Sequence, residues 1–263
     1  MAATPLERVL RRDRLVVLGA LVALTAIAWA YVIRLAAAMA MPEGAMEMAG
    51  MVMAPAFEGW TARDAAVMGL MWAVMMVGMM LPSVAPMLLI HARVARQALG
   101  SGKPFAATGW FAAGYLLAWI GASIVATTAQ WALERALLLS PATMRADQAV
   151  GGVLLVLAGL YQWTPLKDAC LAQCQAPLLF IQRHGGLRRD PAGSLRLGAR
   201  HGLYCIGCCW PLMALLFVGG VMNLLWIAAI AAFVLLEKTL PVGRALSRAA
   251  GAAAVVMGVW MLW

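Results

Sequence analysis

Residues 65–90 read AAVMGLMWAVMMVGMMLPSVAPMLLI, a run that contains no charged side chain. An α-helix rises about 1.5 Å per residue and the hydrocarbon layer of a bilayer is about 30 Å thick, so roughly 20 apolar residues are enough to cross it. This run is therefore predicted to span a membrane as one helix. Pro82 and Pro86 each remove a backbone hydrogen bond near its end, which favours a kink there.

Working outward from this run, six further apolar stretches have the character of spanning helices. The chain is 64% hydrophobic and only 12% charged, whereas soluble domains are roughly half apolar and a quarter charged. We therefore expect an all-α fold, a polytopic transmembrane helical bundle of about seven spans that forms a single integral membrane domain over residues 1–263. The predicted spans are Leu15–Ala38, Ala65–Ile90, Phe105–Trp131, Gln148–Trp163, Leu203–Val221, Leu224–Leu236 and Ala245–Trp263.

The basic residues are gathered in short clusters between alternate apolar runs, and they account for the net charge of +9. Clusters placed in this way act as topology signals rather than as a nucleic-acid surface, so no nucleic-acid partner is expected. The positive-inside rule puts the N-terminus in the cytoplasm and residues 167–200 in a basic cytoplasmic loop. Residues 39–64 are acidic and rich in methionine, and they are predicted to form an extracytoplasmic loop. The basic clusters are Arg8, Arg11, Arg12 and Arg14; Arg93, Arg96 and Lys103; Lys167, Arg183, Arg188, Arg189, Arg196 and Arg200; and Lys238, Arg244 and Arg248.

Nineteen methionines are an unusual number, and their positions are informative. Six lie in or beside the predicted outer loop, at Met39, Met41, Met46, Met48, Met51 and Met53. Another set recurs at helical spacing along the second span, at Met68, Met71, Met75 and Met79, with Met76 and Met80 beside them. Thioethers are soft, uncharged ligands that favour Cu(I). The alternative is ordinary packing, because methionine fills irregular gaps in a core.

All five cysteines fall into two windows near the predicted cytoplasmic face. Cys170 and Cys174 are four residues apart, and Cys205, Cys208 and Cys209 follow the i, i+3, i+4 pattern of one helix face. Met213 lies on the same face one turn after Cys209, and His201 lies one turn before Cys205. Thiolates are strong soft-metal ligands that the reducing cytosol keeps available, although a free cysteine can also be a small buried hydrophobe. The candidate metal ligands are Cys170, Cys174, Cys205, Cys208, Cys209, Met213, Met68, Met71, Met75, Met79, Met76, Met80 and His201.

Three segments also carry a resemblance: MMVGMMLPS at 75–83, YQWTPLKDAC at 161–170 followed by Cys174, and YCIGCCW at 204–210. Together with GVMN at 220–223 and the Glu237–Lys238 pair, they resemble an uncharacterised bacterial family described as predicted metal-binding integral membrane proteins. The resemblance runs from about residue 65 to residue 242. It implies that the methionine helix, both cysteine windows and the Glu237–Lys238 pair belong to one recurring arrangement.

These features favour an inner-membrane protein that binds a soft metal ion for transport or delivery toward the cytoplasm. Cu(I) is favoured and Zn(II) is possible, with methionines outside and through the bilayer and cysteines inside. The expected partners are the lipid bilayer, the metal ion, and a metal-delivery protein or a larger membrane complex. No nucleotide-binding or catalytic motif is present, so we expect no enzyme. Two alternatives stay open: a membrane thiol–disulfide redox carrier, and a non-catalytic assembly factor or complex subunit with a structural metal site.

Overall fold

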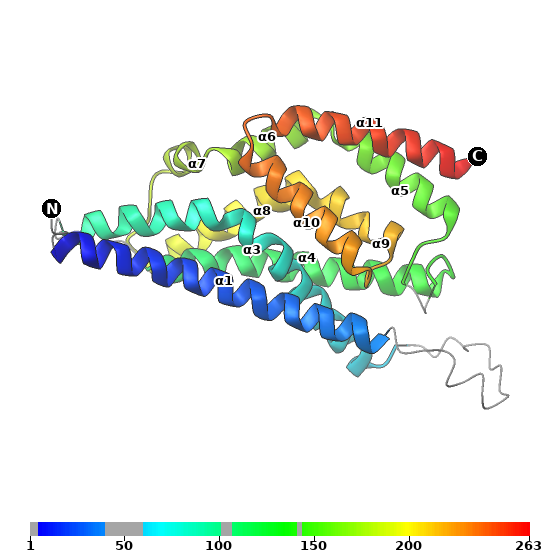
Figure 1. The fold of residues 1–263 in the computed structure, drawn as a ribbon, viewed down its shortest axis with the longest axis horizontal. Coiled ribbons are helices and arrows are strands. Elements are labelled where there is room, and N and C mark those ends of the chain that lie inside the picture. The colour runs from blue at the N-terminus through cyan, green and yellow to red at the C-terminus, as the bar shows by residue number, and fades with distance from the viewer. Residues whose placement is uncertain (1–4, 40–59, 101–106, 141–143) are drawn as a thin grey trace.

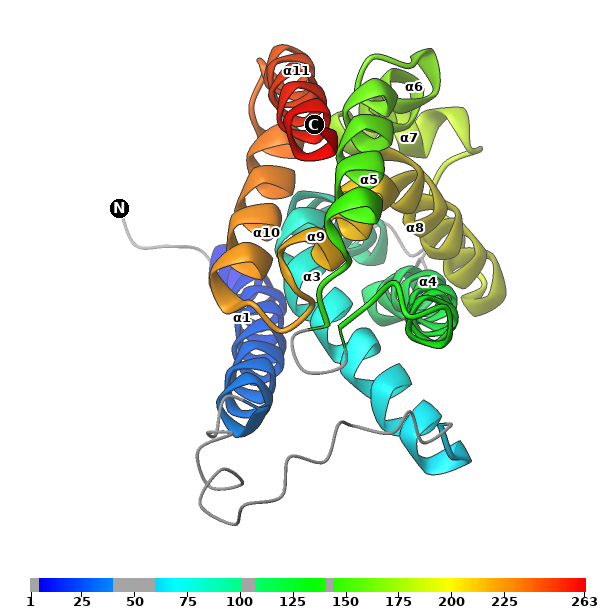
Figure 2. The same cartoon turned by 90° about the vertical axis from the view of Figure 1, so that its right-hand side faces the viewer.

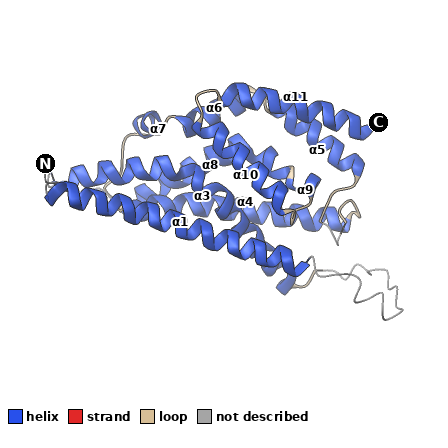
Figure 3. Ribbon diagram, viewed as in Figure 1, coloured by secondary structure: helices blue, strands red, loops and turns tan. Residues whose placement is uncertain are grey.

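A computed structural model describes residues 5–39, 60–100, 107–140 and 144–263. Within these ranges the chain is helical, with no strand and one isolated β-bridge between Leu139 and Ala146, which confirms the all-α prediction (Figure 3). The helices are α1 (Pro5–Met39), α3 (Ala62–Gly100), α4 (Thr108–Arg135), α5 (Gln148–Tyr161), α6 (Pro165–Gln175), α7 (Pro177–Arg183), α8 (Pro191–Ala214), α9 (Leu216–Gly219), α10 (Leu224–Thr239) and α11 (Gly243–Leu262).

The long helices run lengthwise beside one another, and the two chain ends lie at opposite ends of the bundle (Figure 1). Helix α3 is central, since it packs against α1, α4, α7 and α10. The other extensive contacts pair α4 with α8 and α5 with α11. Viewed along the bundle, α1 lies on its outside, while α8 and α10 lie on either side of α3 (Figure 2). The buried core follows α3 and α8.

Among the residues that the structure describes, five helices are long and apolar enough to cross a membrane, compared with the seven predicted spans. They cover Leu15–Ala38, Ala62–Ala95, Thr108–Arg135, Pro191–Gly219 and Gly243–Leu262. A sixth span results if α5 and α6, which meet at an angle of 68°, are counted as one broken span. Helix α10 has 16 residues, which is about 24 Å of helix and less than the thickness of the hydrocarbon layer.

The segment 167–200, predicted as a basic loop, is largely helical. Asp190 caps α8 by accepting a hydrogen bond from the backbone N–H of Gly193, and Pro191 occupies the first helical turn. Both residues favour a helix start, so α8 begins well before Leu203 and carries Arg196 and Arg200. Thr164 and Pro165 start α6 in the same way. The predicted start of the fifth span at Leu203 is therefore too late, because the basic charge was weighed above these capping residues.

Two glycine pairs let α5 and α11 approach backbone to backbone. A Cβ atom on Gly159 would lie 2.6 Å from the carbonyl oxygen of Gly251, and one on Gly251 would lie 2.8 Å from that of Gly159. The second pair, Gly152 and Gly258, lies seven residues away along each helix. A Cβ atom on Gly258 would lie 2.7 Å from the carbonyl oxygen of Gly152. Small residues at a helix crossing permit this close contact, which fixes α11, and with it Ser247, against the rest of the bundle.

Candidate metal centre

The two cysteine windows lie on neighbouring helices, because α6 packs on α8. Cys205, Cys208 and Cys209 are buried on one face of α8, and the thiols of Cys208 and Cys209 hydrogen-bond to the carbonyl oxygen of Cys205 at 3.0 and 2.9 Å. The Cys174 side chain, one residue before the end of α6, lies near those of Cys205 and Cys208. The two cysteine windows of the sequence thus come together in space. We call Cys174, Cys205, Cys208 and Cys209 the thiol cluster.

Cys170 is buried on the same helix as Cys174, and it contacts α8 at Gly207. A Cβ atom on Gly207 would lie 2.8 Å from the Cys170 sulfur, which is closer than two such atoms approach without displacement. Glycine at this position therefore makes room for the thiol. Cys170 and the thiol cluster together account for all five cysteines of the chain, and all five are free thiols.

Lys238 brings a positive charge to the thiol cluster. Its ammonium donates a hydrogen bond to the Cys205 sulfur at 2.8 Å, and its contact with the Ser83 hydroxyl is longer, at 3.4 Å. The Tyr115 hydroxyl lies 3.1 Å from the same sulfur. Lys238 and Tyr115 are both buried. A buried sulfur that accepts from an ammonium is stabilised as an anion, because a nearby opposite charge favours the charged form.

A second buried lysine lies behind the thiol cluster. Lys167 forms an ion pair with Glu237 at 2.7 Å between its Nζ and Oε1, and neither side chain is exposed. The Lys167 ammonium also donates to the carbonyl oxygen of Cys208, and the Ser247 hydroxyl donates to Glu237 Oε1. These contacts join α6, α8, α10 and α11 at one point. Lys167 and Lys238 belong to the basic clusters predicted between the spans, but the structure buries both because each has a partner in the core.

The methionine stripe of α3 faces the core. Its buried members are Met71, Met75, Met76, Met79 and Met80, and Met68 is half-buried. At one end of the stripe, the Met80 carbonyl accepts a hydrogen bond from Tyr115, which also contacts Cys205. Met213 is buried on α8, one turn beyond Cys209. The methionines at 41, 46, 48, 51 and 53 lie outside the described residues.

His201 lies one turn before Cys205 on α8 and is buried among aromatic rings. Its ring centroid is 4.8 Å from that of Phe180, 5.9 Å from that of Phe111 and 6.0 Å from that of Tyr115. Its Nδ1 has no hydrogen-bond partner among the described residues. Tyr115 thus contacts both His201 and Cys205, and His201 lies among aromatic rings rather than among the sulfurs.

The opposite end of α3 carries a polar network that the sequence analysis missed. Glu134 is buried and accepts hydrogen bonds from the indole of Trp60 at 2.7 Å and from the amide of Gln130 at 2.8 Å. Gln130 in turn accepts from the Trp72 indole at 2.7 Å, and its amide nitrogen lies 3.9 Å from the Met68 sulfur. The spacing of Gln130 and Glu134, one turn apart near the end of an apolar helix, is the signal that could have indicated it.

Across the described residues, no three His, Cys, Asp or Glu side chains converge closely enough to form a closed metal site. The sulfurs are instead held by hydrogen bonds to backbone and to Lys238. The donor set consists of thiols with thioethers nearby, and such soft ligands select Cu(I) over hard cations. The donor chemistry therefore fits a soft metal ion such as copper.

This arrangement defines a helical protein in which membrane-length apolar helices surround a buried, thiol-rich centre. A comparison with protein families gives a more specific result: residues 69–261 match the model of PpoB2, a copper chaperone family. The chain belongs to this family. The match includes every residue of the thiol cluster, Lys167, Glu237 and Lys238, and it overlaps most of the region that carries the resemblance described above. No curated protein and no solved structure matches the chain.

Proposed function

We propose that this protein is a multi-pass protein of the bacterial cytoplasmic membrane that holds Cu(I) at the thiol cluster and delivers it toward the cytoplasm. It acts as a carrier of the ion rather than as an enzyme, and it hands the ion to a metal-delivery protein or to a larger membrane complex. The observation that carries the proposal is the contact between Lys238 and Cys205, because it provides an anionic sulfur among three further thiols.

Charge balance supports this assignment. The buried Lys167 is compensated by Glu237, whereas the closest acceptor of Lys238 is the Cys205 sulfur. Isolated charges are costly to bury, and buried charges are generally paired. A Cys205 thiolate gives Lys238 such a partner. When Cu(I) binds two thiolates, the resulting complex carries one negative charge, and the Lys238 ammonium is already in place to neutralise it.

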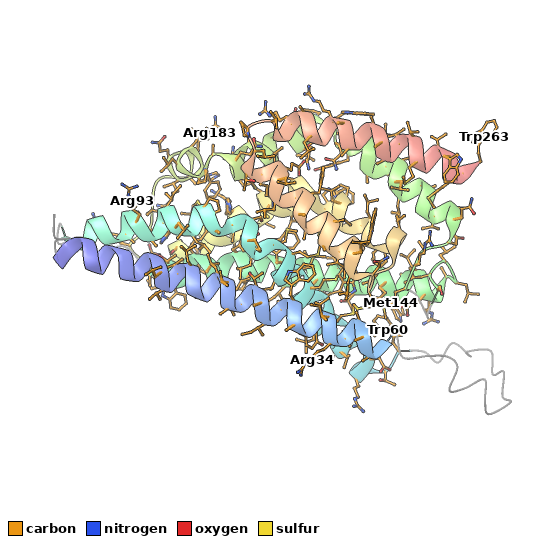
Figure 4. All side chains as sticks on the ribbon, viewed as in Figure 1. Arg34, Trp60, Arg93, Met144, Arg183 and Trp263 are labelled. Carbon is orange, nitrogen blue, oxygen red and sulfur yellow. The ribbon has the colours of Figure 1, made fainter. Side chains whose placement is uncertain are left out.

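The distribution of charge along the bundle supports a cytoplasmic location for the end of the bundle where α7 is found. Arg93 and Arg183 lie toward the end of the bundle where α7 is found, while Trp60, Met144 and Trp263 lie toward the other end (Figure 4). Positive side chains are concentrated on the cytoplasmic side of membrane proteins. With α7 on that side, the N-terminus lies inside, and the opposite location of the two termini agrees with an odd number of crossings. Seven crossings require α5 and α10 to cross as short or broken spans.

A second candidate function is thiol–disulfide exchange. It is favoured by the interaction of Cys174 with Cys205 and Cys208, which brings thiols of two helices together. A disulfide needs a Cα–Cα separation of about 4.4–6.8 Å and is formed by attack of a thiolate. An electron relay across the membrane also needs thiols that can be reached from both faces, and all five cysteines of this chain lie on α6 and α8.

The test is the metal content of protein purified in detergent without oxygen. The wild type is compared with Cys205/Cys208/Cys209→Ser and with Met257→Leu, a control at an exposed methionine of α11. We expect near-stoichiometric copper in the wild type and the control, and its loss in the serine variant, with helix content and elution volume unchanged. Copper retained by the serine variant overturns the proposed site. The exchange function is supported instead if the wild type is purified without metal, does not bind added Cu(I), and contains a disulfide between Cys174 and a cysteine of α8.

A further inference from the structure

A cavity of about 310 Å³ lies between α3, α4 and α8. Two of the residues that line it are Met76 from α3 and Met213 from α8, and three more are Trp72, Trp119 and Trp210. We infer that this cavity is a second Cu(I) site, in which the two thioethers bind the ion and the indole rings surround it. This inference rests on the proposed function, because it supplies the step before the ion reaches the thiol cluster.

The lining residues have the chemistry that a monovalent soft cation requires. Thioethers bind Cu(I) without adding charge, so the ion keeps its positive charge and can leave the cavity again. The faces of tryptophan rings attract cations, more strongly so when the site is shielded from water. Trp72 and Trp119 are fully buried, and the Trp72 ring packs against Phe217 at a centroid distance of 5.4 Å. Together these groups offset part of the cost of placing a charge in an apolar cavity.

The position of the cavity connects the two polar regions of the molecule. Trp72 contributes to its wall, while the indole N–H of the same residue donates to Gln130 in the network that includes Met68 and Glu134. On the other side, Met213 lies one helical turn beyond Cys209 of the thiol cluster. An ion in the cavity would therefore lie between the buried carboxylate at one end of α3 and the thiols on α8.

A lipid acyl chain is the competing occupant. Val125 and Trp210 line the cavity and are 69% and 52% exposed, so the cavity opens at the outer surface between α4 and α8. An acyl chain that fills it would contact the same tryptophans but would need neither thioether. The two occupants therefore differ in their dependence on sulfur.

The experiment uses Ag(I), a redox-stable analogue of Cu(I), added without oxygen to full-length protein in detergent. Bound silver and tryptophan fluorescence are measured together for the wild type, Met76→Leu/Met213→Leu, Cys205/Cys208/Cys209→Ser and Met87→Leu. Met87 is a buried methionine of α3 that does not line the cavity, so it controls for loss of a core methionine. Leucine keeps the volume and apolar character of methionine, so the variants are expected to fold.

We expect the wild type and Met87→Leu to bind a further equivalent of silver beyond that held by the thiol cluster, with quenching of tryptophan fluorescence. The methionine double variant should lose that equivalent and its quenching, or bind it at least tenfold more weakly. The serine variant should keep both. Silver binding and quenching in the double variant that equal those of the wild type overturn the cavity site.

The remaining outcomes separate this inference from the proposed function. If the serine variant loses all silver and all quenching, the cavity site is wrong while the thiol site stands. If the serine variant keeps all of its silver while the methionine double variant loses one equivalent, the cavity site stands and the thiol site is wrong. In bilayers with brominated acyl chains, quenching that is equal in the wild type and the double variant and is unaffected by Ag(I) identifies a lipid occupant and overturns the inference.

Discussion

The ammonium of Lys238 on α10 lies 2.8 Å from the sulfur of Cys205 on α8, and both side chains are buried. The two residues are separated by 33 positions in the chain, so only the packing of α10 against α8 and α3 brings them together. The ammonium therefore stabilises an anionic sulfur in the free protein, and it would also neutralise the net negative charge of a copper bis-thiolate.

We expect Lys238→Met to weaken Cu(I) binding by at least about tenfold, or about 1.4 kcal/mol. The reason is that a buried copper bis-thiolate would then lack its neutralising charge, and uncompensated buried charges are strongly unfavourable. Lys238→Arg keeps the charge and should bind Cu(I) more tightly than Lys238→Met. The measurement is competition with a colorimetric Cu(I) chelator in detergent. Equal affinities for Lys238→Met and the wild type would show that the lysine does not compensate the bound complex.

The Lys167–Glu237 ion pair is expected to be structural. Glu237→Gln leaves Lys167 buried without its carboxylate, which should lower the free energy of unfolding by about 3–5 kcal/mol. The double variant Lys167→Met/Glu237→Gln removes both charges and should lose less stability than the sum of the losses in Lys167→Met and Glu237→Gln alone. Thermal unfolding in detergent, followed by circular dichroism, measures all four proteins. Additive losses would contradict a coupled pair.

Gly159→Ala is expected to loosen the contact between α5 and α11, because the added Cβ would lie 2.6 Å from the carbonyl oxygen of Gly251. Overpacking of this kind typically costs about 1–3 kcal/mol. Gly121→Ala on α4 is the matched control, since a Cβ there meets no atom within 4 Å. Thermal unfolding should show a lower midpoint for Gly159→Ala and no decrease for Gly121→Ala. A similar decrease in both would mean that the helix contact is not the cause.

The proposed topology predicts the location of two loops. A reporter that is active only in the cytoplasm should be active when inserted at Gly185–Gly186, between α7 and α8. The same reporter should be inactive when it is inserted at Leu137–Leu138, after α4. The reason is the concentration of arginines around α7. An alkaline phosphatase reporter, which is active only outside, should give the opposite pattern. Activity of the same reporter at both positions would mean that α5 and α6 turn back without crossing.

The membrane-length helices were predictable from the sequence because an apolar run and a helical repeat are local properties. The run at 65–90 lies within α3, and the spacing of Cys205, Cys208 and Cys209 placed them on one face of α8. The start of α8 was predicted too late, although Asp190 and Pro191 carried a local signal for it. The count of spans does not follow from the sequence, because α5 and α10 are short and length alone does not decide whether a short helix crosses.

The sequence by itself determined the helical class, the apolar windows and the shared faces of the sulfur residues, since the geometry of a single helix dictates each of these. Only the tertiary structure decided that Lys167 and Lys238 are core residues, that Cys174 meets Cys205, and that Met76 and Met213 line one cavity. These relationships join residues on different helices, and they depend on how the helices pack. A charged side chain near a helix end has the same local sequence whether it faces water or a buried partner, so its burial follows from packing alone.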